Sequence, residues 1–103
     1  MKRILLICDL GMSTSLVVKR MKQAAEAQGL PVEIEAKGMQ SFRSLIQDFD
    51  CVLLGPQISY KLQECQTIGA EFGKPVTCID MMSYGMTDGE KILAQALSLL
   101  EEK

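Results

Sequence analysis

The stretch "RILLICDLGMSTSLVV", residues 3–18, sets the pattern that the rest of the chain repeats. It opens with a continuously apolar run ending at Cys8, and a small polar segment then leads into residues with helical periodicity. Continuous apolar runs of this length are typical of strands buried on both faces of a parallel sheet. The stretch therefore predicts a strand, a tight loop and a helix, with Cys8 at the carboxyl end of the strand.

Three more short apolar runs follow, separated by stretches of helical periodicity. Such alternation predicts a parallel sheet with right-handed crossovers and helices on both faces. The run "VEIEA" alternates polar and apolar residues and suits an edge strand, whereas the first and third runs suit the centre. We expect a flavodoxin-like α/β fold with strand order 2-1-3-4, which places a ligand crevice between strands 1 and 3. The expected strands cover residues 3–8, 32–36, 51–55 and 76–80.

Two of the expected helices end at a glycine. Gly29, followed closely by a proline, ends the first helix as a left-handed cap, and Gly73 ends the third in the same way. The third helix is expected to run to Phe72. Its apolar stripe consists of Ile58, Leu62 and Cys65. The apolar face of the first helix consists of Val17, Met21, Ala24 and Ala25.

The second and the last expected helices are marked by their N-terminal residues. The second covers residues 41–49, with Ser41 as a fair N-cap. Before the last helix, "TDGE" at 87–90 matches a capping box, with Thr87 as the cap and Glu90 bonding back to it. The apolar face of the second helix is Phe42, Leu45, Ile46 and Phe49. That of the last helix is Ile92, Leu93, Ala96, Leu97 and Leu100.

Composition indicates one globular domain over residues 1–103, with 48% hydrophobic and 23% charged residues. No apolar run approaches the roughly 20 residues of a membrane helix, and the N-terminus lacks the features of a signal peptide. A net charge of −2 without a basic stripe argues against nucleic acid as a partner. We expect a cytoplasmic protein that is a monomer in isolation.

The four cysteines occur without any histidine in the chain and without a CxxC pair. We therefore expect no metal and no cofactor, and no Ser-His-Asp or Cys-His catalytic arrangement. Cys51, Cys65 and Cys78 fall at positions typical of the core. Cys8 could also be a small core residue, but glycine and hydroxyl residues directly follow it, which a core cysteine does not need.

The loop after Cys8 is suited to bind an anion. Backbone N–H groups at the start of a helix, together with the helix dipole, favour a thiolate and can cradle a phosphoryl group attached to its sulfur. Gly11 allows close approach of the backbone, and hydroxyl groups add donors without charge. We predict Cys8 as the nucleophile. The predicted phosphate-binding loop consists of Asp9, Leu10, Gly11, Met12, Ser13, Thr14 and Ser15.

Three motifs, "CDLGMSTS" at 8–15, "VLLGPQISYKL" at 52–62 and "IDMMSYGMTDGEKIL" at 79–93, carry a resemblance that spans the chain. With them the chain resembles the enzyme IIB component of the lactose, cellobiose and chitobiose branch of the bacterial sugar phosphotransferase system. The resemblance implies a phosphocysteine carrier in which Cys8 accepts a phosphoryl group from a phosphohistidine of enzyme IIA. Cys8 then passes the group to a sugar bound by membrane enzyme IIC. The resemblance also implies a four-stranded parallel sheet of order 2-1-3-4.

Several residues outside the loop are candidates for lining the site or docking a partner. Gln57 and Tyr60 follow the third strand and Tyr84 follows the fourth, so they can reach the same sheet edge. Ordinary helix-start polarity and a half-buried turn tyrosine are the alternative interpretations. Adaptable methionines suit docking to two different partners. Those expected in loops at this edge are Met12, Met81, Met82 and Met86.

Asp9 departs from the small neutral residue that usually follows the cysteine in this family. A carboxylate that faced inward would disfavour the thiolate and repel a phosphoryl group, so we expect Asp9 to face solvent.

Two other functions compete with the carrier. Low-molecular-weight tyrosine phosphatases resemble the same plan of strand, cysteine loop and helix, but they carry a phosphate-clamping arginine where this chain has Thr14. The other rival is a IIB-like regulatory domain that binds proteins without phosphotransfer, with Asp9 as a sign of lost transfer.

Overall fold

Four parallel strands form the centre of the molecule, as the sequence predicts. The computed structural model describes residues 2–8 and 15–101. The strand order is β2-β1-β3-β4, so the expected order 2-1-3-4 is confirmed, as is the edge position of β2. The strands are β1 (Lys2–Cys8), β2 (Val32–Gly38), β3 (Cys51–Leu54) and β4 (Val76–Cys78).

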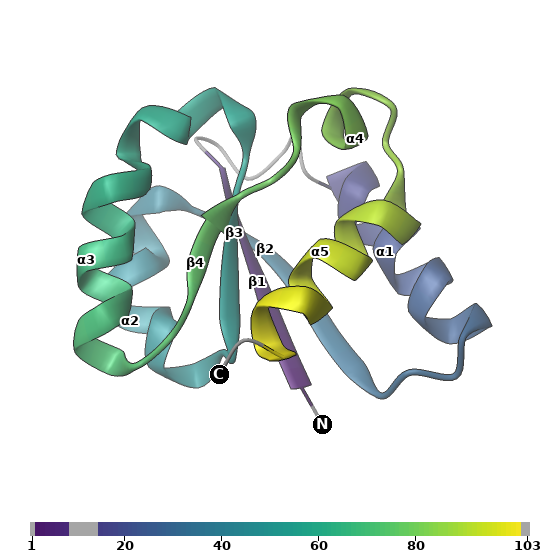
Figure 1. Ribbon diagram of the computed structural model, residues 1–103, viewed down its shortest axis with the longest axis horizontal. Helices are drawn as coiled ribbons and strands as arrows, with labels where there is room; N and C mark the ends of the chain where they lie inside the picture. Colours follow the sequence, from purple (N-terminus) through teal and green to yellow (C-terminus); the bar gives the residue numbers. More distant parts are fainter. Residues whose placement is uncertain (1, 9–14, 102–103) are drawn as a thin grey trace.

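Helices cover both faces of the sheet (Figure 1). On one face lie α1 (Ser15–Ala27), α4 (Met81–Gly85) and α5 (Gly89–Glu101). On the other lie α2 (Phe42–Leu45) and α3 (Leu62–Phe72). Three 3₁₀ segments complete the described elements: η1 (Met39–Ser41), η2 (Ile46–Asp48) and η3 (Pro56–Lys61). None of the helices that the structure describes is long and apolar enough to cross a membrane.

Alternate side chains of β1 supply two separate cores. Ile4 and Leu6 pack with α1 and α5, whereas Leu5 and Ile7 pack with the cluster around Phe42 and α3. All four strand side chains are fully buried. Because successive side chains of a strand point to opposite faces, Cys8 points to the same side as Ile4 and Leu6. The catalytic candidate therefore faces the layer of α1 and α5.

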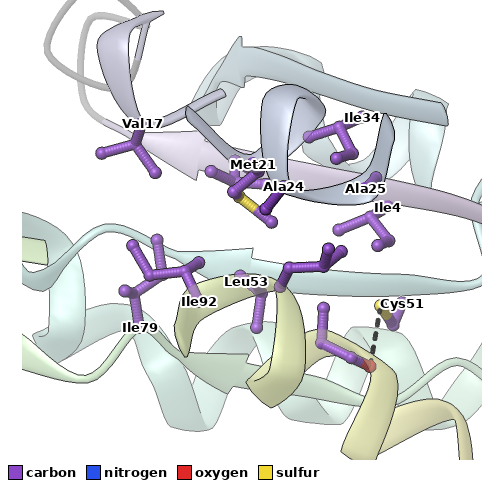
Figure 2. Packing of buried hydrophobic residues seen from close by; sticks show 13 residues of the cluster. Ile4, Val17, Met21, Ala24, Ala25, Ile34, Cys51, Leu53, Ile79 and Ile92 are labelled. Carbon is purple, nitrogen blue, oxygen red and sulfur yellow. Dashed lines mark hydrogen bonds between the residues drawn. The ribbon is translucent and has the colours of Figure 1, made fainter. Parts of the chain in front are cut away.

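Figure 2 shows the core on the α1 and α5 side. Met21 of α1 lies between the sheet and the helices, and Cys51 of β3 donates from its Sγ to the carbonyl oxygen of Ala96 at 3.9 Å. The predicted α1 face is confirmed, since its four apolar residues are all buried. Cys51 and Cys65 are fully buried, as expected of core residues, and Cys78 is half-buried.

The predicted helix ends at Gly29 and Gly73 are correct. Their φ angles are +67° and +68°, in the left-handed region that glycine adopts without strain. The expected last-helix cap is wrong: α5 begins at Gly89, and Asp88 accepts from the Lys91 N–H through Oδ1 at 3.1 Å. Thr87 instead has a φ of +53°, because the chain reverses there between α4 and α5.

Two expected α-helices are partly 3₁₀. The segment predicted as a helix over 41–49 is divided into η1, α2 and η2, although Phe42, Ile46 and Phe49 are buried as predicted. A 3₁₀ turn rises about 2.0 Å per residue against about 1.5 Å for an α-helix, so these turns help a short crossover span the sheet. Ile58 is not on α3 but in η3, where its backbone is non-helical.

Gly89 allows α5 to approach α1 closely. A Cβ at this position would overlap the backbone of Arg20 and Met21, which cannot move aside as a side chain can. The close contact of these two helices closes the core beneath β1 and β3.

We predict that Gly89→Ala lowers the free energy of unfolding by about 1–3 kcal/mol, because it forces α1 and α5 apart. Urea denaturation measures the change. Gly85→Ala is the matched control, since a Cβ at Gly85 meets nothing within 4 Å. Equal urea midpoints for the two variants would show that the close approach of α1 and α5 does not require a glycine at position 89.

Candidate functional site

Cys8 occupies the last position of the central strand β1 and is fully buried. It pairs in register with Gly38 at the end of β2. On its other side, Gly55 directly follows β3 and donates its N–H to the Ile7 carbonyl at 2.8 Å. The ends of three neighbouring strands thus meet at Cys8, at the edge of the sheet where α4 also lies (Figure 1).

Most of the predicted phosphate-binding loop lies outside the described residues. These positions are Asp9, Leu10, Gly11, Met12, Ser13 and Thr14. Ser15 is the first residue of α1 and is exposed. The anion-binding role of the loop and the outward orientation of Asp9 therefore stay predictions.

Gln57, in η3 after β3, and Tyr84, in α4 after β4, meet at the carboxyl edge of the sheet near Cys8. Gln57 Nε2 donates to the Tyr84 hydroxyl oxygen at 3.0 Å. A Cβ built on Gly55 would lie 2.7 Å from Gln57 Oε1 and 3.4 Å from Cys8 Cβ, so the carboxamide and the cysteine adjoin the same glycine. The structure thus brings Cys8, Gln57 and Tyr84 together. Tyr60, in contrast, is 75% exposed.

Tyr84 belongs to a short helix where the sequence analysis expects a loop. Asp80 caps α4, because its Oδ2 accepts from the Ser83 N–H at 3.0 Å and from the Ser83 hydroxyl at 2.9 Å. These hydrogen bonds hold the pKa of the Asp80 carboxyl below its usual value. The bond from the Ser83 N–H has the larger effect, and the bond from the Ser83 hydroxyl adds to it. Tyr84 lies on the resulting turn and packs against the core on the α1 and α5 side.

Gln95 of α5 fixes the start of this segment. Its Nε2 donates to the Cys78 carbonyl at 2.8 Å, and its Oε1 accepts from the Asp80 N–H at 3.1 Å. This double contact holds the backbone just beyond β4, which ends at Cys78 and not at the expected residue 80. Gln95 is a positioning residue that the sequence analysis does not single out.

Exposed apolar side chains also gather on α4. Met81 and Met82 are each 73% exposed and Met86, just after the helix, is 68% exposed. The first two lie on α4, so the expectation that they lie in a loop is wrong. Met12 lies outside the described residues. A docking role for these methionines stays a prediction.

Comparison with known proteins assigns the family. The family described as "PTS system, Lactose/Cellobiose specific IIB subunit" matches residues 3–95. The chain belongs to this family. The oligo-β-mannoside-specific EIIB component of Bacillus subtilis is 46% identical over 100 residues, covering 97% of each chain. The cellobiose-specific EIIB component of Lactococcus lactis is 38% identical over 104 residues, covering 96% of each.

Solved structures of IIB components have the same fold. The cellobiose-specific IIB component of Borrelia burgdorferi is 33% identical, with a TM-score of 0.84 over 99% of this chain and 94% of that one. The lactose-specific IIB domain of Streptococcus pneumoniae has a TM-score of 0.86 at 15% identity, over 95% and 96%. A low-molecular-weight tyrosine phosphatase of B. subtilis has a TM-score of 0.57 at 16% identity, over 98% of each chain. This likeness concerns the fold alone. The expected likeness to both groups is confirmed for the fold.

The EIIB family assigns this chain to the sugar phosphotransferase system and to its phosphotransferases. At the carboxyl edge of the sheet, Cys8 lies near the uncharged polar side chains of Gln57 and Tyr84. Such side chains can donate hydrogen bonds to an anion.

The Asp80 cap makes the α4 segment sensitive to acid. Because the folded-state pKa of Asp80 is lowered, the cap stabilises the fold above the ordinary carboxyl pKa, and this contribution is lost as pH falls through the lowered value. We predict that Asp80→Ala lowers the thermal midpoint at pH 7 and that its difference from the unmodified protein narrows toward pH 3.

Thermal denaturation over pH 3–7 measures this difference. Glu26→Ala, which removes an exposed carboxylate of α1, is the control and should show no such trend. A difference for Asp80→Ala that is independent of pH would contradict the assigned cause.

Proposed function

We propose that this EIIB component is a phosphocysteine carrier. Cys8 accepts a phosphoryl group from a phosphohistidine of enzyme IIA and passes it to a sugar bound by membrane enzyme IIC. The observation that carries this proposal is the position of Cys8 at the carboxyl end of the central strand, beside Gln57, in a family of phosphotransferases. In open α/β sheets, ligands bind outside this edge, where the strand order reverses.

The other three cysteines are less suited to accept a phosphoryl group. Burial raises the pKa of the Cys65 and Cys78 thiols, which reduces the reactive thiolate at neutral pH. Cys51 lies in the middle of the core, with its Sγ directed to the Ala96 carbonyl. Each of the three lies away from the end of β1.

The transfer consists of two displacements at phosphorus. In the first, the Cys8 sulfur attacks, the N–P bond of the phosphohistidine breaks, an S–P bond forms, and the thiol proton passes to the imidazole or to solvent. In the second, a sugar hydroxyl attacks, the S–P bond breaks, an O–P bond forms, and the hydroxyl proton is released as the thiolate returns. Neither step needs a metal on this subunit, and positioning supplies most of the catalysis.

The partners and the sugar follow from the same proposal. Enzyme IIA is the donor, and enzyme IIC holds the sugar at the membrane, so this chain works in the cytoplasm and associates with the membrane through IIC. We propose a monomer and a β-linked disaccharide as the sugar. The names of the oligo-β-mannoside and cellobiose relatives support that class.

A phosphocysteine carrier must lose sugar phosphorylation when its sulfur is replaced. We predict that Cys8→Ser folds normally but abolishes phosphoenolpyruvate-dependent sugar phosphorylation in a reconstituted system, because an unactivated hydroxyl is a poor nucleophile. Cys78→Ser is the matched control, since it makes the same change at the carboxyl end of β4, and it should remain active.

Activity of Cys8→Ser close to that of the unmodified protein would overturn the proposal. An unmodified protein that is folded but is never phosphorylated by phospho-IIA would instead favour the regulatory function.

A further inference from the structure

The two strands that flank β1 both end in the pattern Gly-x-Gln. After β2 the residues are Gly38, Met39 and Gln40, and after β3 they are Gly55, Pro56 and Gln57. Neither glycine is required by its backbone, because φ is −79° at Gly38 and −63° at Gly55, values that any residue adopts. Another cause must explain the absence of a side chain at both positions.

The space beside each glycine is filled by the glutamine two residues later. A Cβ at Gly38 would lie 2.6 Å from Gln40 Oε1, and one at Gly55 would lie 2.7 Å from Gln57 Oε1. Both distances are shorter than real contacts of a Cβ atom. Each glycine therefore lets a carboxamide fold back over the end of its strand.

Both carboxamides lie on the same face of the sheet as the Cys8 side chain. Cys8 pairs in register with Gly38, and paired residues of neighbouring strands direct their side chains to the same face. On the other side, the Cβ position of Gly55 is 3.4 Å from Cys8 Cβ. Gln40, Cys8 and Gln57 therefore stand in a row across β2, β1 and β3.

The row is anchored at one end. The hydrogen bond from Gln57 Nε2 to the Tyr84 hydroxyl joins η3 to α4 across the edge of the sheet. The Asp80 cap and the contacts of Gln95 hold α4 in turn. Oε1 of each glutamine is the amide atom nearest its glycine. A half-turn of the amide exchanges Oε1 and Nε2, and the Tyr84 hydroxyl can then donate to Gln57 Oε1 and keep the contact.

We propose that Gln40 and Gln57 hold the phosphoryl group on Cys8, each turning its amide so that Nε2 donates an N–H to a phosphoryl oxygen from one side of the sulfur. The inference rests on the proposed function and names two further binding residues for it. Neutral amides stabilise the charge of the group without the bidentate guanidinium clamp of a phosphatase. Such a site suits a carrier, which must bind the phosphoryl group and release it to the next acceptor.

The first test compares phosphorylation rates of variants with phospho-IIA. A hydrogen bond to a charged group contributes about 1.5–3 kcal/mol, which corresponds to a rate loss of about 10- to 100-fold for each glutamine. We expect Gln40→Ala and Gln57→Ala each to lose at least about tenfold in rate. Gln63→Ala, the same change at an exposed position of α3, is the matched control and should keep the rate.

A second pair of variants displaces the amides without deleting them. Gly38→Ala and Gly55→Ala fit the backbone but occupy the space of the carboxamides, so Gln40 and Gln57 must swing outward. We expect each to reproduce the rate loss of the glutamine variant next to it.

The unmodified protein supplies a readout that does not depend on any variant. In ¹H–¹⁵N spectra, the side-chain NH₂ signals of Gln40 and Gln57 should shift on phosphorylation, whereas that of Gln63 should not. If the protein is phosphorylated but these signals stay in place and the variants react at the normal rate, the inference is wrong and the carrier function stands. If the protein is not phosphorylated at all, the proposed function fails, and the inference fails with it.

Discussion

The site depends on the in-register pairing of β1 between β2 and β3. This pairing makes β1 a central strand whose two faces are covered by helices, and it directs Cys8 to the face covered by α1 and α5. Because side chains alternate along a strand, a slip of one residue would turn Cys8 to the opposite face and exchange the apolar side chains of β1 between the two cores. The apolar residues Ile4 to Ile7 oppose such a slip, since each is fully buried in one core or the other. Hydrophobic packing therefore fixes the position of the Cys8 sulfur.

The layer of α1, α4 and α5 holds the other side of the site in place. Gly89 allows α5 to lie against α1, and Gln95 of α5 reaches the end of β4. From there Asp80 begins α4, on which Tyr84 meets Gln57. Contacts far apart in the sequence thus connect the core to the carboxamide beside Cys8. Uncharged amide and hydroxyl groups bind an anion less strongly than a guanidinium group does. Such binding suits the proposed carrier, which must release its phosphoryl group.

The strand order and the place of Cys8 could be predicted because each rests on a local pattern. The apolar run ending at Cys8 and the alternation in 32–36 distinguish a central strand from an edge strand. The stops at Gly29 and Gly73 could be predicted for the same reason, since a left-handed residue ending a helix is a local feature.

The errors arise where distant contacts decide the structure. Thr87 matches an N-cap in sequence, but the reversal after α4 gives it a positive φ and leaves Asp88 as the cap. The short helix α4 depends on Gln95, which no local pattern connects to Asp80. Gln40, which we propose as a binding residue, carries no local signal in the sequence. Its meaning depends on the register of Gly38 with Cys8, which the sequence does not show.

In the proposed function, the sulfur of Cys8 carries the phosphoryl group. The most direct measurement is intact mass, followed by peptide mapping, after incubation with phosphoenolpyruvate, enzyme I, the histidine phosphocarrier protein and a cellobiose-type IIA. We predict an acid-sensitive gain of one phosphoryl group, located on the peptide that contains Cys8. No gain with active upstream components, or a gain located on another peptide, would contradict it.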